Sequence, residues 1–158
     1  MNRIVDASVV VKWLVPEPGS ERAAELMRHP VMAPDTLVPE CLNALRKKVV
    51  RGQLHEDDAR AAASILARAG ITFESTQPLA EDILALSLQL SHPAYDCAYL
   101  AMARKFDGVV ITADQRLVSR CRQPDAADLA RRVQALSEAT PMVQERAVRP
   151  YRARRKAA

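Results

Sequence analysis

Short apolar runs alternate with longer segments of helical period along most of the chain. Runs with the length of buried strands lie at 3–6, 31–34, 71–74 and 109–112, with a weaker fifth candidate at 132–136. Helical patterns occupy the intervals, at 8–15, 20–28, 38–51, 56–70, 79–90, 95–106 and 114–121. Strands that alternate with helices are typical of a parallel sheet covered by helices on both faces. The sequence therefore predicts a three-layer α/β/α fold around a parallel sheet of four to five strands.

Turn-forming residues separate these segments. Pro16, Glu17, Pro18 and Gly19 close the first helical pattern, and Ser20 is placed to cap the next helix at its N-terminus. The composition is that of a globular protein, with 49% hydrophobic and 27% charged residues. We expect one domain over residues 1–139.

The basic character of the chain comes from its C-terminal end. The formal net charge is +4, but residues 146–158 contain six Lys and Arg and no acid. Without those six, 17 bases stand against 19 acids, so residues 1–145 carry a formal charge of −2. We expect residues 140–158 to form a basic, flexible tail. Its arginines could bind phosphate groups or contact acidic residues elsewhere in the chain.

The three cysteines, Cys41, Cys97 and Cys121, are scattered and lack the CxxC spacing of a metal or redox motif. They indicate free thiols in a reducing compartment. No run of about 18 apolar residues and no leader-like N-terminus is found, so a cytoplasmic location is expected, without membrane contact.

Four acidic residues occupy positions that an α/β fold would direct to one place. Asp6 ends one strand-like run and Asp114 follows another, whereas Glu40 and Asp96 each open a helical pattern behind a nearby proline. In open α/β sheets, ligands bind beyond the carboxyl ends of the strands. Carboxylates gathered there repel one another unless a divalent cation neutralises them. The pattern predicts a metal site, and such a site suggests phosphodiester chemistry.

Each of these residues also has a simpler interpretation. Asp6, with Ser8, and Asp114 could be ordinary helix caps. Thr112 could hold a metal-bound water or orient a carboxylate, or it could simply favour the strand. Asp96 is the most informative acid, because its helical segment must be largely buried, where a lone carboxylate costs several kcal/mol. His92 is interpreted as a turn residue, with a base or ligand as the alternative.

The helical segment that contains Glu40 also carries a group of basic residues. Asn43 shares the helix face of Glu40, and Arg46, Lys47, Lys48 and Arg51 follow. This basic group could contact phosphates. A solvent-facing helix surface is the simpler interpretation for Lys47 and Lys48.

Taken together and in order, four motifs resemble the PIN-domain family, and within it the VapC toxins of bacterial toxin–antitoxin pairs. The motifs are Val5-Asp6-Ala7-Ser8, Pro39-Glu40 with Asn43-Ala44-Leu45, His92-Pro93-Ala94-Tyr95-Asp96-Cys97, and Ile111-Thr112-Ala113-Asp114. The resemblance covers about residues 2–137 and implies an endoribonuclease with a Mg²⁺ or Mn²⁺ site. It implies Asp6, Glu40, Asp96 and Asp114 as metal-site residues, supported by Ser8 and Thr112, a homodimer, and a cognate antitoxin as partner.

Two functions remain as alternatives to a metal-dependent ribonuclease. One is a non-catalytic module that binds RNA or a protein partner through the arginines of the tail. The other is a receiver- or phosphatase-like α/β domain, although Asp6-Ala7-Ser8 lacks the second acid of a DxD motif. For the nuclease, a metal-activated water predicts 5′-phosphate and 3′-hydroxyl products. Asp6 and Asp96 are expected as the most direct ligands, with Glu40 and Asp114 holding waters or a second ion.

Overall fold

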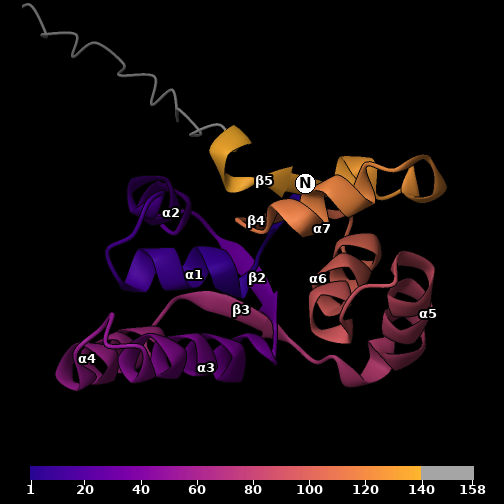
Figure 1. Ribbon diagram of the computed structural model, residues 1–158. Helices are drawn as coiled ribbons and strands as arrows, with labels where there is room; N and C mark the ends of the chain where they lie inside the picture. The colour runs from indigo at the N-terminus through magenta and orange to yellow at the C-terminus, as the bar shows by residue number, and fades with distance from the viewer. Residues whose placement is uncertain (140–158) are drawn as a thin grey trace, which may run out of the picture.

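A parallel five-stranded sheet forms the centre of the computed structural model, which describes residues 1–139 (Figure 1). The strand order is β3-β2-β1-β4-β5. The strands are β1 (Asn2–Val5), β2 (Val31–Pro34), β3 (Ile71–Glu74), β4 (Gly108–Thr112) and β5 (Val133–Ala135). All neighbouring strands pair in parallel, with Ile4 opposite Met32 on one side and Val110 on the other. The predicted fold class and the weak fifth strand are confirmed.

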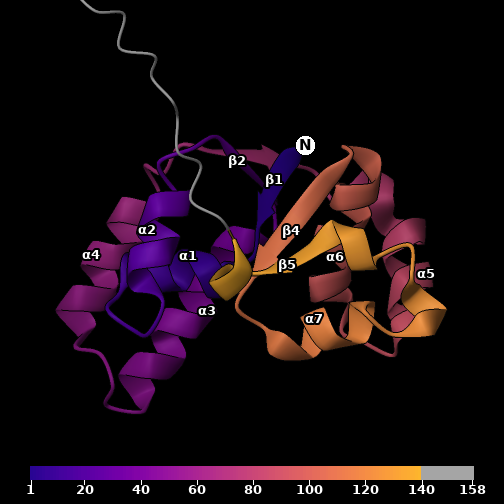
Figure 2. The same ribbon diagram turned by 90° about the horizontal axis from the view of Figure 1, so that it is seen from above.

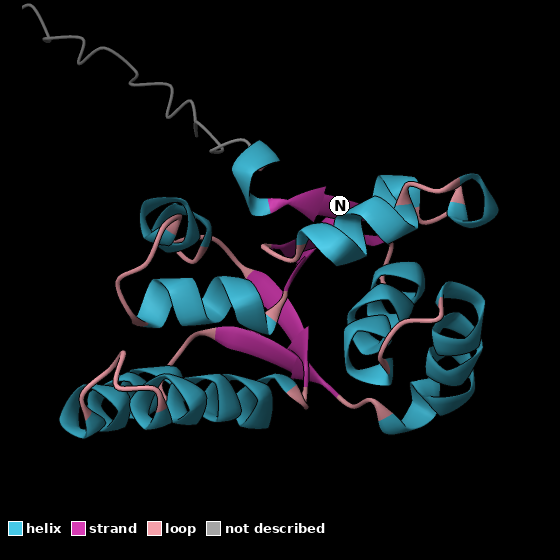
Figure 3. Cartoon of the chain, in the orientation of Figure 1, coloured by secondary structure: helices cyan, strands magenta, loops and turns pink. Residues whose placement is uncertain are grey.

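Within residues 1–139, seven α-helices cover the sheet in two layers, with α1–α4 on one face and α5–α7 on the other (Figures 1 and 2). The first layer contains α1 (Ala7–Leu14), α2 (Ser20–Leu26), α3 (Leu37–Val50) and α4 (Glu56–Leu66). The second contains α5 (Ala80–Leu90), α6 (Ala94–Lys105) and α7 (Gln115–Cys121). Short 3-10 turns span Gln77–Leu79, Pro124–Ala126, Ala130–Arg132 and Leu136–Glu138 (Figure 3).

An aliphatic core lies between the sheet and both helical layers. Ile4, Val5, Val110 and Ile111 are fully or almost fully buried in the two central strands. Helix α6 packs on β1, β2 and β4, and every residue from Cys97 to Ala103 is buried. The expectation that the helix of Asp96 is largely buried is confirmed, and the three cysteines are free and buried.

The loop before α2 differs in detail from the prediction. Ser20 is the first residue of the helix, and Gly19 occupies the cap position with φ of 94°. The Ser20 hydroxyl instead donates to the Val15 carbonyl (3.2 Å) and accepts from the Glu17 amide (2.9 Å). The predicted N-cap was wrong, because the Ser20 hydroxyl bonds to backbone groups of the preceding loop and not to the amides of the helix. This loop fixes the backbone of Glu17.

The strand order reverses between β1 and β4, because β2 and β3 are added on one side of β1, whereas β4 and β5 are added on the other. Such a switch point opens a crevice at the carboxyl ends of the two strands. Asp6 follows β1 and Asp114 lies two residues beyond β4, so both lie at this crevice. Among residues 1–139, none of the helices has the length and apolar character to cross a membrane. The predicted tail, 140–158, lies outside the described residues.

Candidate metal centre

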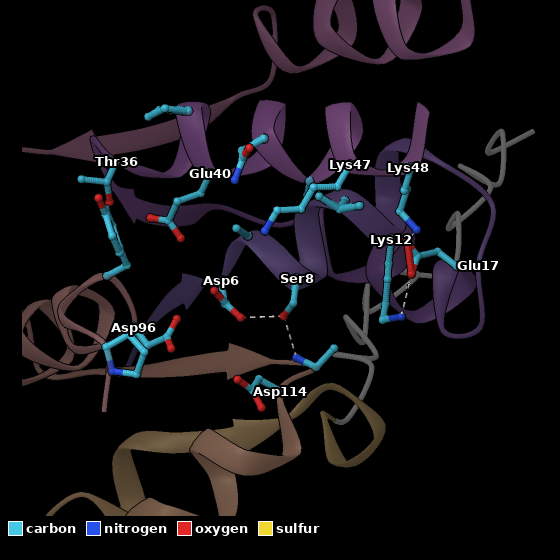
Figure 4. A pocket seen from close by; sticks show the side chains of 18 residues that line it. Asp6, Ser8, Lys12, Glu17, Thr36, Glu40, Lys47, Lys48, Asp96 and Asp114 are labelled. Carbon is cyan, nitrogen blue, oxygen red and sulfur yellow. Dashed lines mark hydrogen bonds and ion pairs between the residues drawn. The ribbon is translucent and has the colours of Figure 1, made fainter. Parts of the chain in front are cut away.

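All four predicted acids line one cleft, which has a volume of about 820 Å³ and lies at the switch point of the sheet (Figure 4). Asp6 comes from the end of β1, Glu40 from the first turn of α3, Asp96 from the first turn of α6, and Asp114 from the residue before α7. Residues up to 108 positions apart are thus brought together by the topology.

Asp6 is held by two hydroxyl groups. Ser8 Oγ donates to Asp6 Oδ2 at 2.5 Å, and Thr112 Oγ1 donates to the same oxygen at 2.6 Å. Asp6 occupies the cap position of α1, but its side chain makes no capping hydrogen bond. Burial raises the pKa of Asp6 even though both hydroxyls lower it, and the charge of Asp114 raises it further. The two hydroxyl groups thus fix the orientation of the carboxylate, which lines the cleft and forms no ion pair with any residue in 1–139.

Thr112 and Ser8 extend this arrangement to the loop after β4. Thr112 is fully buried, and its hydroxyl oxygen accepts from the Asp114 amide at 2.9 Å. Ser8 Oγ accepts from the Ala113 amide at 3.0 Å. One hydroxyl-centred network therefore fixes both Asp6 and the backbone that carries Asp114, as expected for supporting residues of a site.

Asp114 is both a helix cap and a residue of the cleft, the two interpretations given for it in the sequence analysis. Its Oδ1 accepts from the amides of Arg116 (2.8 Å) and Leu117 (3.4 Å), which is an N-terminal cap of α7. These bonds use Oδ1 and leave Oδ2 for the cleft. The same side chain can therefore start a helix and serve as a metal ligand.

His92 and Asp96 form a pair at the N-terminal end of α6. His92 Nε2 lies 2.9 Å from Asp96 Oδ2, and 14% of the His92 side chain is exposed. Burial raises the pKa of Asp96, the charge of Asp6 adds to this, and His92 partly offsets it. His92 does lie in the turn before α6, but its ring also pairs with Asp96, which lines the cleft, and the turn interpretation alone does not describe this contact.

Glu40 also lies where the charged form of a carboxyl group is disfavoured. Burial, together with the charges of Asp6 and Asp96, raises its pKa to about 7. Its Oε1 is buried without a hydrogen-bond partner among residues 1–139, as are the hydroxyls of Thr36 and Tyr99. A buried oxygen without a partner is costly, so this corner suits an ion or its water shell.

The donor set fits a hard divalent cation, with one difference from the predicted ligands. One donor atom each from His92, Asp96 and Asp114 lies within 4.8 Å of the other two. Asp6 and Glu40 line the same cleft outside that close group. Carboxylate oxygens suit Mg²⁺ and Mn²⁺, and an imidazole nitrogen shifts preference toward Mn²⁺.

The far half of the cleft holds charged residues that were not expected to join the acids. Lys47 and Lys48 line it together with Lys12 and Glu17. Lys47 is exposed, as a solvent-facing surface would require, yet both lysines face the cleft. The sequence pattern identified Lys48 as part of a basic group on its helix. It did not predict that Lys12 and Glu17 would lie beside Lys48, because no sequence motif connects these three residues.

The fold and the acids define a doubly wound α/β domain with a carboxylate centre at its switch point. A family model described as PIN domain matches residues 3–123. Ribonuclease VapC3 of Pyrobaculum aerophilum is 32% identical over 124 residues, which cover 76% of this chain and 95% of that protein. Ribonuclease VapC1 of Mycobacterium tuberculosis is 30% identical over 132 residues, covering 81% and 97%. The chain belongs to the PIN-domain family, as its four motifs predicted.

Solved structures agree with this fold. The crystal structure of PAE2754 from Pyrobaculum aerophilum superposes with a TM-score of 0.66 at 16% identity, covering 87% of this chain and 90% of that one. Mycobacterium tuberculosis VapC20, described as a sarcin-ricin loop cleaving toxin, gives a TM-score of 0.59 at 19% identity, covering 72% and 91%. At these identities the likeness concerns the fold.

Proposed function

We propose that this protein is a Mg²⁺- or Mn²⁺-dependent endoribonuclease that acts as the toxin of a toxin–antitoxin pair. The observation that carries the proposal is the meeting of four carboxylates from four separate elements in one cleft. Burial raises the pKa of three of them, Asp6, Glu40 and Asp96, so the site favours a bound positive charge. Its VapC ribonuclease relatives support RNA as the substrate.

In this proposal, the residues divide the work according to their surroundings. Asp96 and Asp114 would hold the ion together with Asp6, whose Oδ2 is fixed by Ser8 and Thr112. Glu40, with its unpartnered buried oxygen, would hold and orient water. The bound ion would supply activation of a water for in-line attack on phosphorus and neutralise charge on the phosphate. The products would carry 5′-phosphate and 3′-hydroxyl ends.

Cleavage of a mixed RNA substrate by the purified full-length protein tests this function. Wild type and Asp96→Asn would be incubated with Mg²⁺, with Mn²⁺ and with EDTA, and the ends of the products mapped. We expect cleavage by wild type only, abolished by EDTA and restored by added metal. Equal cleavage by both proteins, or cleavage that survives EDTA, would contradict the proposal. RNA binding without cleavage would favour the non-catalytic module.

Two partners belong to the same proposal. A cognate antitoxin would inhibit by placing a basic side chain in the acidic end of the cleft, where four carboxylates attract it. Titration with that antitoxin should abolish cleavage with an equivalence point near one per active site.

A second copy of the chain is the other partner. Leu84 and Leu88, one turn apart on α5, are 59% and 71% exposed and provide an apolar surface. Leu88→Glu should shift sedimentation from dimer to monomer, whereas a monomeric wild type would exclude the homodimer.

A further inference from the structure

Most of the lysines of this chain line the cleft, although lysine is much rarer in the chain than arginine. The chain contains five lysines, and three of them, Lys12, Lys47 and Lys48, line this one cleft. Among residues 1–139 no arginine lines it, although arginine is far more frequent in the chain. The cleft therefore has two halves, an acid half around Asp6 and a lysine half at the other end.

A single face of α3 connects the two halves. Glu40, Asn43, Ala44, Lys47 and Lys48 all line the cleft, with the spacing of one helix face. At a rise of about 1.5 Å per residue, Lys48 lies about 12 Å along the axis from Glu40. The lysine half is thus close enough to contact a chain that also lies across the acid half.

Glu17 holds two of these lysines together. Its carboxylate lies 3.1 Å from Lys12 Nζ and 3.0 Å from Lys48 Nζ, so it joins α1 to α3. Burial alone would raise the pKa of Glu17, but hydrogen bonds and charges from Lys48 and Lys12 outweigh it and lower the pKa. Because Glu17 stands between two prolines in a loop closed by Ser20, its position is fixed independently of the lysines.

The lysine half retains donors for an anion after these ion pairs form. Each ammonium group has three N–H donors. Lys12 donates one of them to Glu17 Oε2, and the Lys48 ammonium group lies 3.0 Å from Glu17 Oε1, so donors remain on both lysines. Lys47 forms no ion pair among residues 1–139, and Figure 4 shows its side chain pointing toward the middle of the cleft. The three lysines and Glu17 together carry a formal charge of +2.

We propose that Lys12, Lys47 and Lys48 bind backbone phosphates of the RNA strand next to the phosphate that is cleaved. This inference rests on the proposed ribonuclease function. An acidic peptide would meet four carboxylates in the adjoining half and be repelled. A strand of RNA spans both halves, because its scissile phosphate needs the metal and its neighbouring phosphates need cations. Glu17 keeps two like charges together and lowers the affinity of the lysine half for anions.

RNA binding in the absence of cleavage tests the proposal. Fluorescence anisotropy of a labelled single-stranded oligoribonucleotide would be measured in EDTA over a range of salt concentrations, with full-length variants. Lys47→Met and Lys12→Met/Lys48→Met should bind about fivefold more weakly per lysine removed, and the salt slope should fall by about 0.7 per lost phosphate contact. Glu17→Gln should bind more tightly with a steeper slope. Lys105→Met, an exposed lysine at the far end of α6, should match wild type.

Two further measurements separate this proposal from the proposed function. Mn²⁺ binding, followed by calorimetry, should be the same in the lysine variants and wild type within about twofold, because they leave the acid half unchanged. Lysine variants that bind RNA like wild type would overturn the proposal. A wild type that binds RNA through these lysines but never cuts it would contradict the nuclease alone.

Discussion

The two halves of the cleft carry opposite charges and are built in different ways. In the acid half, each carboxylate stands at a strand end or in the first turn of a helix, and short hydrogen bonds hold Asp6 and Asp114 in place. In the lysine half, long side chains extend from α1 and α3 and meet at one glutamate in a loop. The acid half is therefore positioned by backbone topology, whereas the lysine half is positioned by side-chain contacts.

The pKa values of Glu40 and Glu17 differ in the way that the opposite charges of the two halves predict. Burial and two neighbouring carboxylates raise the pKa of Glu40 to about 7. Glu17 is also partly buried, yet two ammonium groups lower its pKa. Residues of the same type in one cleft are thus shifted in opposite directions by their neighbours. The charged forms of the carboxylates are disfavoured in the acid half, whereas the charged form of Glu17 is favoured in the lysine half.

Neutralising Asp6 should have the largest effect on activity and separate the two halves most clearly. We expect Asp6→Asn to reduce RNA cleavage by at least about a hundredfold, because it removes a charge from the metal site. The melting temperature in EDTA should not fall, since burial already disfavours the charged form of Asp6. RNA binding in EDTA should persist through the lysine half. Loss of binding together with cleavage would mean that the halves do not act separately.

Removing the Thr112 hydroxyl should have the next largest effect. Thr112→Val keeps the size of the side chain but deletes a donor to Asp6 and an acceptor for the Asp114 amide. Losses of about 10- to 100-fold in metal affinity or cleavage are typical for such supporting groups. Thr72→Val, at an exposed site of β3, is the matched control and should leave both unchanged. Equal effects of the two variants would assign Thr112 a role in strand stability only.

The contrast between the halves also explains how much could be predicted. Asp6, Asp96, Glu40 and Asp114 were found because strand ends and helix starts can be recognised from apolar period, and parallel topology gathers them. The pairing of Lys12 with Lys48 could not be found in this way, because it depends on where the loop with Glu17 lies in three dimensions.

His92 was underestimated for a similar reason. A histidine beside a proline is ordinary in a turn, and only the start of α6 at Ala94 places its ring 2.9 Å from Asp96. The side-chain network of Ser8 and Thr112 was expected only in outline, since hydrogen bonds across 104 and 106 positions follow from the pairing of β1 with β4.

The raised pKa of Glu40 predicts an effect of pH on stability. Because the folded protein binds the Glu40 proton more tightly than the unfolded chain, this stabilisation is complete below about pH 4.5 and is lost as the pH rises through about 7. Melting temperatures in EDTA should therefore fall between pH 5 and pH 8, and Glu40→Gln should reduce that fall by a few °C. Mn²⁺ should reverse it at pH 8 in wild type. The same fall in Glu40→Gln and wild type would place its origin elsewhere.

The smallest effect should come from separating the two roles of Asp114. Asn and Asp cap helices about equally, whereas Ala does not. Asp114→Asn should therefore keep the bonds from Arg116 and Leu117 and unfold at nearly the wild-type denaturant concentration, while Asp114→Ala should lose about 1 kcal/mol. Both variants should weaken Mn²⁺ binding, because both remove the charge that faces the cleft. If Asp114→Asn binds Mn²⁺ as wild type does, Asp114 is a helix cap alone, and the acid half then depends on Asp6, Glu40 and Asp96.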